Sequence, residues 1–185
     1  MPFVAGCADE SFPPADHRAL RAALNENGNA AIASSGGEIK VVSLRDAGVT
    51  DIQPLAGLPL IALDLTGVPI DDLTPLRGMP LEELFLAETR VADLSPLAGM
   101  PLRRLVLSNT QVTDVRPLAG MPLLSLDMSG TPVADIAALR TLRRLQRLNI
   151  AGTAVADLSP LADLPLTKLE FTPSRIERGL DAVPR

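Results

Sequence analysis

The amino-acid sequence predicts an α/β solenoid in which short parallel strands stack into a curved sheet. Three observations support this fold class. A segment of about 21 residues recurs six times in phase, each copy alternates leucine with a variable residue, and proline and glycine punctuate the copies. Of the 185 residues, 46% are hydrophobic and only 2% aromatic, so aliphatic side chains must fill the core. We therefore expect one row of coils, each burying its leucines against the next.

Two columns of residues define the phase of the repeat. An Asp recurs after steps of 21, 21, 21, 21 and 22 residues, and Pro follows three residues later in every copy but one, where Ala138 takes its place. The extra residue lies in segment 141–148, which lacks the Gly-Met-Pro sequence of the preceding copies. The Asp column consists of Asp51, Asp72, Asp93, Asp114, Asp135 and Asp157.

Each copy contains an alternating x-Leu-x-Leu sequence, which is typical of a short strand with one buried face. Pairs such as Leu84/Leu86 and Leu105/Leu107 are expected to point inward. The phase predicts seven parallel strands that line the concave face of the solenoid. Their centres are expected near residues 42, 63, 84, 105, 126, 148 and 169.

The Asp-Leu-Ser-Pro-Leu sequence, found in two copies and varied in the others, predicts a short 3-10 turn on the convex face. Ser95, Thr74 and Ser159 each precede Pro, which favours Ser or Thr as N-cap and Pro as the first helical residue. The few residues before the next Gly and Pro favour a 3-10 turn over an α-helix. We expect the Asp column to accept hydrogen bonds from N–H groups of the following turn. The alternative, calcium binding, lacks the D-x-D-x-D-G sequence of a calcium loop.

The segment before the repeats, residues 13–38, is interpreted as an N-terminal cap. A short helix is expected over 13–24, with Asp16 as its N-cap. A turn-rich stretch over 25–38 then leads into the first strand. The apolar stripe of the predicted helix consists of Ala19, Leu20, Ala23 and Leu24.

The repeats are expected to occupy residues 39–172, and residues 173–185 a C-terminal cap. Ile176, Leu180 and Val183 have helical spacing and predict a small lid over the last coil. We expect this lid to be a shortened one, or the chain to be a fragment.

The first segment, residues 1–12, is predicted to be disordered or to contain a lipidation signal. Residues 4–7 (VAGC) match the bacterial lipobox, in which Cys7 becomes the lipidated N-terminus. A secretory signal also needs a basic start and an apolar stretch of about 7–15 residues, but only three residues precede the box. The match is therefore either chance or the remnant of a trimmed start. We expect a cytoplasmic protein in the first case and a lipid-anchored envelope protein in the second.

Composition excludes several classes of function. One Cys and one His cannot form a Cys/His zinc site or an internal disulfide. A net charge of −5 and the absence of Trp and Tyr argue against nucleic-acid binding. No apolar run reaches the ~18 residues of a membrane span. His17 has no nucleophile motif beside it and no glycine-rich phosphate loop occurs, so we expect no catalytic residue, no metal and no cofactor.

These motifs resemble the repeats of bacterial leucine-rich repeat proteins, over residues 39–171. The D-[LI]-x-P-L sequence is similar to the internalin class, and the Pro-Leu and Gly-Thr sequences are similar to repeats in bacterial proteins that carry serine/threonine kinase domains. No kinase motif occurs in this chain. The family usually has Asn after the strand, whereas four copies here have Thr and one has Val68; a hydroxyl can satisfy fewer groups than an amide. The threonines are Thr89, Thr110, Thr131 and Thr153.

The outward positions of the strands differ from copy to copy and predict a binding surface on the concave face. Phe85 and Val106 lie side by side on neighbouring strands, with Glu83 and Arg104 beside them. An apolar centre with a charged rim is typical of a binding hot spot. The alternative is an isolated apolar pair beside a weak Glu83–Arg104 ion pair. The candidate partner-binding residues are Asp64, Glu83, Phe85, Arg104, Val106, Asp127 and Arg147.

The function predicted from these patterns is a monomeric, non-catalytic module that binds a protein or peptide through its concave face. Two alternatives stay open. The chain is a regulatory segment of a larger enzyme such as a serine/threonine kinase, or it is a structural lipoprotein of the cell envelope.

Overall fold

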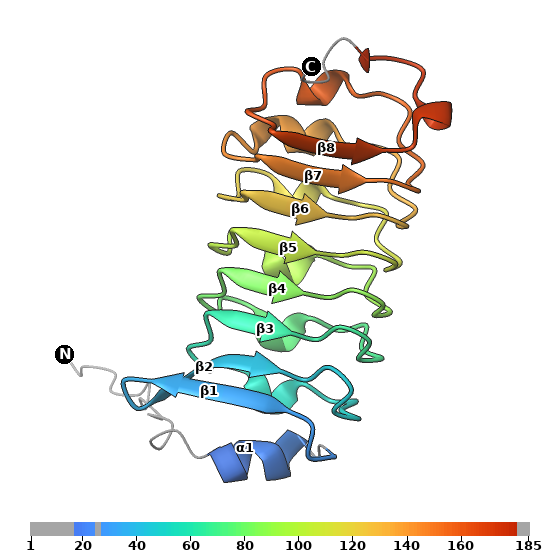
Figure 1. Cartoon of the computed structure of the whole chain (residues 1–185). Helices are drawn as coiled ribbons and strands as arrows, with labels where there is room; N and C mark the ends of the chain where they lie inside the picture. Colours follow the sequence, from blue (N-terminus) through green and yellow to red (C-terminus); the bar gives the residue numbers. More distant parts are fainter. Residues whose placement is uncertain (1–16, 25–26, 181–185) are drawn as a thin grey trace, which may run out of the picture.

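The computed structural model describes residues 17–24 and 27–180. In these residues eight strands form one sheet in chain order, stacked as a single row (Figure 1). β2 to β8 pair in parallel, whereas β1 runs antiparallel to β2. The strands are β1 (Ala31–Ser35), β2 (Glu38–Ser43), β3 (Ala62–Asp64), β4 (Glu83–Phe85), β5 (Arg104–Val106), β6 (Ser125–Asp127), β7 (Arg147–Ile150) and β8 (Lys168–Phe171).

The register of the parallel strands follows the sequence repeat. Leu63 pairs with Leu84, Leu84 with Leu105, and Leu105 with Leu126. Leu126 then pairs with Leu148, so the extra residue of that copy lies outside the strand ladder. All seven predicted strand centres fall within β2 to β8, which confirms the parallel solenoid predicted from the repeat.

The other side of the solenoid consists of 3-10 turns, as the sequence predicts (Figure 1). Where the repeat has proline, it is the second residue of the 3-10 turn, in the first turn of the helix where its fixed φ and missing N–H are tolerated. Where Ala138 replaces proline, the turn is longer. The turns on this side are η1 (Gln53–Leu55), η2 (Thr74–Leu76), η3 (Ser95–Leu97), η4 (Arg116–Leu118), η5 (Ala137–Thr141) and η6 (Ser159–Leu161), whereas η7 (Pro173–Arg175) directly follows β8.

Aliphatic side chains fill the space between the sheet and the turns. Leu84, Leu86, Leu105 and Leu107 are fully buried, as their alternation in the sequence predicts. One continuous cluster of buried apolar side chains runs through the coils and includes the methionines of the repeat. Each coil therefore buries its leucines against its neighbours, which is the arrangement that makes a repeat depend on stacking.

The threonine column is buried and satisfied within each coil. Thr89 Oγ1 donates to the carbonyl oxygen of Leu86 at 2.8 Å, and Thr110 Oγ1 donates to that of Leu107 at 2.7 Å. The two later threonines of the column form the same bond. Among the described residues, no buried side-chain nitrogen or oxygen lacks a hydrogen-bond partner. A hydroxyl with one acceptor is thus sufficient at this position.

The N-terminal helix α1 (His17–Leu24) lies at one end of the stack, beside the β1–β2 hairpin (Figure 1). Leu20 and Leu24 are buried, whereas Ala19 and Ala23 of the predicted stripe are exposed. Two leucines spaced by four are enough to attach a helix of eight residues to the core. The predicted N-cap Asp16 lies outside the described residues, as do segment 1–12 with Cys7 and residue Val183.

The stretch expected to be only turn-rich contains β1, which the sequence analysis missed. Gly36 and Gly37, with φ of 63° and 84°, form the turn between β1 and β2. Both conformations are readily adopted by glycine, and positive φ at both central residues suits a tight hairpin. β1 covers the hydrogen-bonding edge of β2 that would otherwise be open.

The described part of the C-terminal segment is helical only at η7 and at Leu180, so the two do not join into one continuous helix there. Arg178 forms a parallel bridge with Asp157, and its carbonyl accepts the N–H of Leu158 at 3.0 Å. The segment therefore continues the repeat, with Ile176 half buried against the core. The reason lies at Gly179, where φ is +78° and a Cβ would approach Ser159 N to 2.3 Å. Only glycine allows this close contact between the two backbones.

Candidate functional site on the strand face

The outward side chains of β2 to β8 form one surface, which we call the strand face and which is the side predicted to be concave. It lies on the opposite side of the core from η1 to η6 (Figure 1). Inward positions of the strands are almost all leucine, whereas outward positions include acids, bases, small residues and Phe85. The strand face is therefore where the coils differ from one another.

Phe85 and Val106 are paired in register on β4 and β5, and both are half buried. The guanidinium carbon of Arg104 lies 4.9 Å from the centroid of the Phe85 ring, which is cation–π geometry. Glu83 is the register partner of Arg104, yet the described residues contain no ion pair between them. Arg104 covers the aromatic ring instead, so the sequence-based alternative of a Glu83–Arg104 ion pair is wrong.

The two aspartates of the candidate set are engaged by their own coils and by a neighbouring coil. Asp64 Oδ1 accepts the N–H of Thr66 at 2.9 Å, and Asp64 Oδ2 lies 3.4 Å from the Arg45 guanidinium. Asp127 Oδ1 accepts the N–H of Ser129 at 2.9 Å and its hydroxyl at 2.7 Å. Each aspartate therefore closes the turn that follows its strand, as Asp side chains do in Asx turns.

Arg147, on β7, is exposed and forms no ion pair within the described residues. Arg143 and Arg144 lie just before it, in the corner that contains the extra residue of this copy, and both are exposed. The buried side chains of Leu142 and Leu145 anchor this corner to the core. The structure thus adds two arginines to the edge of the candidate site beside the one that the sequence analysis selected.

The sequence analysis missed an apolar area at the other end of the strand face. Val41 and Ile61 are each 42% exposed, and Leu180 is the only other large hydrophobic side chain exposed in the described ranges. Val41 and Ile61 are adjacent, because the N–H of Ile61 donates to the carbonyl oxygen of Lys40 at 2.8 Å and Val41 pairs with Ala62. The signal was Ile61 itself, which stands where the next two copies have Glu82 and Arg103, although Leu124 in the copy after them is also apolar.

The Asp column lies at the 3-10 turns and each member binds the chain two residues ahead, as predicted. The six Oδ1–N distances are 2.7–2.9 Å. The predicted N-cap role of Thr74, Ser95 and Ser159 is wrong, because each is the first residue of its turn. The hydroxyls of Ser95 and Ser159 donate to the Asp instead. The backbone N–H of Ser95 and its hydroxyl lower the pKa of Asp93, and the Ser159 hydroxyl and N–H lower the pKa of Asp157. These carboxylates are structural acceptors.

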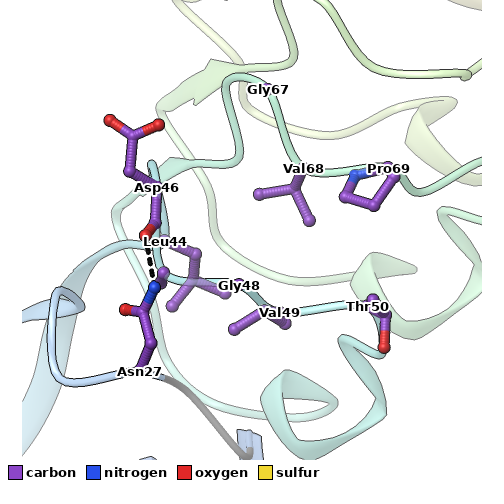
Figure 2. Close-up of a pocket in the computed structure, with 10 residues that line it drawn as sticks. Asn27, Leu44, Asp46, Gly48, Val49, Thr50, Gly67, Val68 and Pro69 are labelled. Atoms are coloured by element: carbon purple, nitrogen blue, oxygen red, sulfur yellow. Dashed lines mark hydrogen bonds between the residues drawn. The ribbon is translucent and has the colours of Figure 1, made fainter.

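A pocket of about 320 Å³ lies between the first two coils, beyond the ends of β2 and β3 (Figure 2). Asn27 Nδ2 donates to the carbonyl oxygen of Asp46 at 2.9 Å on one side of it. Arg90 and Gln111 each donate a main-chain N–H to the preceding coil, but Pro69 at the same position has no N–H to donate. The lining residues are Asn27, Leu44, Asp46, Ala47, Gly48, Val49, Thr50, Gly67, Val68 and Pro69.

This pocket has no paired acid and base, and Asp46 is the only carboxylate in its lining. Across residues 17–24 and 27–180, no group of three His, Cys, Asp or Glu side chains is placed to hold a metal ion. Within the same ranges, no helix combines the length and apolar character needed to cross a membrane.

Stacked 21-residue coils, each with a short strand, a buried leucine pair and a 3-10 turn, define a leucine-rich repeat protein. Among solved structures, the chain is similar to an internalin (InlF) from Listeria monocytogenes, with 27% identity and a TM-score of 0.56 over 70% of this chain and 46% of that one. The functional domain of InlJ from the same organism, which includes a cysteine ladder, has 22% identity and a TM-score of 0.56 over 70% of this chain and 29% of that one. The fold is an internalin-like leucine-rich repeat solenoid.

This chain has one cysteine and so has no counterpart of the InlJ ladder. It spans less than half of either internalin chain. The sequence matches no protein-family model and no curated protein.

Proposed function

We propose that this chain is a non-catalytic module whose strand face binds a protein or peptide, centred on Phe85, Val106 and Arg104. The support comes from a contrast between the two sides of the sheet: the inward residues repeat from coil to coil, and the outward ones do not. Packing accounts for the inward residues. Turn hydrogen bonds account for the outward Asp64 and Asp127, but neither packing nor such bonds account for Phe85, Val106 and Arg104, and recognition is the function that fits these three.

The observation that carries the proposal is the position of the Arg104 guanidinium over the Phe85 ring. Arginine and aromatic side chains are enriched among the residues that dominate binding energy. A partner that covers this pair removes water from it, and a cation–π contact strengthens when it is desolvated. Val106 continues the apolar surface on the next strand.

The backbone beneath this group is held on both sides. β4 and β5 each pair with two neighbouring strands, and the residues after them are tied to the next coil, as in the bond from Leu86 N to Val106 O at 2.8 Å. A surface that is already ordered loses little conformational entropy on binding. The strand face therefore presents its side chains in a preorganised arrangement.

We also propose the division into an N-terminal cap up to residue 38, a solenoid over 39–172 and a C-terminal cap over 173–185. α1 and β1 lie together at one end of the stack, which supports the first boundary (Figure 1). At the other end, the main-chain bonds of Glu177 and Arg178 to Ala156 attach the last segment to the final coil, which is what a C-terminal cap requires.

The test is capture of a partner from a lysate of the native cell by the immobilised chain, with wild type compared with Phe85→Ala and Arg104→Glu. Hot-spot truncation typically costs at least ~2 kcal/mol, so each variant should weaken capture by about 30-fold. Arg77→Glu, on the 3-10 side, is the matched control for Arg104→Glu and should capture as wild type does. If both strand-face variants fold and capture the same partner undiminished, the assignment of this site is wrong.

A further inference from the structure

We propose that the strand face recognises an acidic polypeptide segment of a partner protein, with apolar residues at one end and carboxylates at the other. This inference rests on the proposed function and specifies the chemistry of its ligand. The chain as a whole has a net charge of −5, which by itself predicts a basic partner. On the strand face, however, the charged side chains that lack a partner in the described residues are mostly arginines, which predicts an acidic partner.

The acids of the strand face are mostly engaged by groups of the chain itself. Asp64 and Asp127 accept the N–H groups of the turns that follow them. Glu170 lies 2.6 Å from the ammonium group of Lys168 on the same strand, so these two charges satisfy each other. Glu83 is exposed and forms no ion pair in the described part of the chain.

The arginines have no such carboxylate partners. Arg104 contacts the Phe85 ring, and Arg147 is exposed on β7. Arg143 and Arg144 extend the same basic area at the corner before β7. None of the four lies within 4.0 Å of a carboxylate in the residues that the structure describes. Arg143, Arg144 and Arg147 therefore make the β7 end of this surface basic, whereas Asp127 and Glu83 keep their negative charges nearer to Phe85.

The opposite end of the strand face is apolar. Val41 and Ile61 are exposed there, and Ala62 beside them presents only a methyl group. Between the two ends lie Phe85 and Val106, which are half buried. The surface therefore changes along the stack from aliphatic at β2 and β3 to basic at β7.

The dimensions of the sheet set the length of the ligand. β3 and β7 are separated by four strand intervals, which at about 4.8 Å each is roughly 19 Å. An extended polypeptide covers that distance with about six residues. A segment that lies across the strands thus places aliphatic side chains over Ile61 and Asp or Glu over Arg147, with its centre over Phe85.

The experiment is selection of a displayed random dodecapeptide library on the wild-type chain and on Arg144→Glu/Arg147→Glu. Selection on wild type should yield peptides with Asp or Glu concentrated at one end and aliphatic residues at the other. Synthetic copies of these peptides should bind the double variant at least about tenfold more weakly, because rim charges are reversed, and the loss should shrink at high salt. The control Arg77→Glu/Arg140→Glu changes the net charge equally on the 3-10 side and should change affinity less than about twofold.

The outcomes separate this inference from the proposed function. Peptides that lose affinity in Phe85→Ala but show no acidic enrichment, or that bind the Arg144/Arg147 double variant undiminished, overturn the inference and leave the strand face as the binding site. Peptides that bind all strand-face variants equally well overturn both. Acid-enriched peptides whose affinity depends on Arg144, Arg147 and Phe85 support both.

Discussion

The two sides of each coil use the same local hydrogen bond, but only one side keeps it in every copy. On the 3-10 side, all six Asp residues accept an N–H two residues ahead. On the strand face, Asp64, Asp127 and Asn149 make the equivalent bond, whereas Phe85 and Val106 occupy that column without it. The strand ladder holds the backbone there in any case, so the side chain is free to vary. No ladder precedes the 3-10 turns, and the Asp is needed to begin each one.

The largest difference in stability should come from truncating, one at a time, two consecutive residues of β5 that face opposite sides of the sheet. Leu105→Ala removes a fully buried side chain and should lower the free energy of unfolding by about 2–5 kcal/mol. Val106→Ala, one residue later on the strand face, should cost less than about 1 kcal/mol because this side chain is only half buried. Urea unfolding followed by circular dichroism measures both. Equal losses would contradict the assignment of the two faces.

A smaller effect of opposite sign is expected at the turn after the strand. Glu88 has φ of 61°, where other coils have glycine, as at Gly67 and Gly130. Glu88→Gly should raise the free energy of unfolding by about 0.5–1 kcal/mol, because relief of the left-handed backbone exceeds the entropy that glycine adds to the unfolded chain. Asn109→Gly is the control and should gain less, since Asn tolerates this conformation. A loss of stability in Glu88→Gly would show that the Glu88 side chain supports the fold.

The smallest expected effect is a loss of stability at low pH. The pKa values of Asp93 and Asp157 are below their ordinary value in the folded chain, so the anions contribute stability above about pH 4. That contribution is lost as the pH falls through the lowered pKa values. Urea midpoints between pH 6 and pH 2.5 should therefore decline at the acid end, and Asp93→Asn/Asp157→Asn should flatten the decline. A midpoint independent of pH would mean that these hydrogen bonds do not favour the charged form.

Most of the fold was predictable because the same pattern of leucine, aspartate and proline recurs from copy to copy. Alternating leucines at Leu84/Leu86 and Leu105/Leu107 predict inward strands, and the Asp–Pro spacing predicts the 3-10 side. The hairpin strand β1 was not predictable in this way, because Ala31–Ser35 occurs once and consists mainly of small residues with weak strand preference. Gly179 was missed for a related reason: its role depends on the backbone of Leu158 one coil away.

For the candidate site, the sequence could predict which residues lie next to one another but not how their side chains interact. Counting positions places Phe85 beside Val106 and Glu83 beside Arg104, and the register confirms this placement. Whether the Arg104 guanidinium contacts the Glu83 carboxylate or the Phe85 ring depends on side-chain rotamers, which the spacing in the sequence does not determine. The exposure of Ile61 likewise depends on the corner geometry before β3.

The corner before β7 has a consequence for engineering. One additional residue lies there between Leu142 and Leu145, yet Leu126 still pairs with Leu148 and both neighbouring leucines stay buried. A solenoid that accommodates an inserted residue at one corner without a shift in strand register can be expected to accept a longer insertion at the same corner. A foreign loop or a fluorescent label inserted between Arg143 and Arg144 would therefore be displayed beside the strand face, where it could report on ligand arrival.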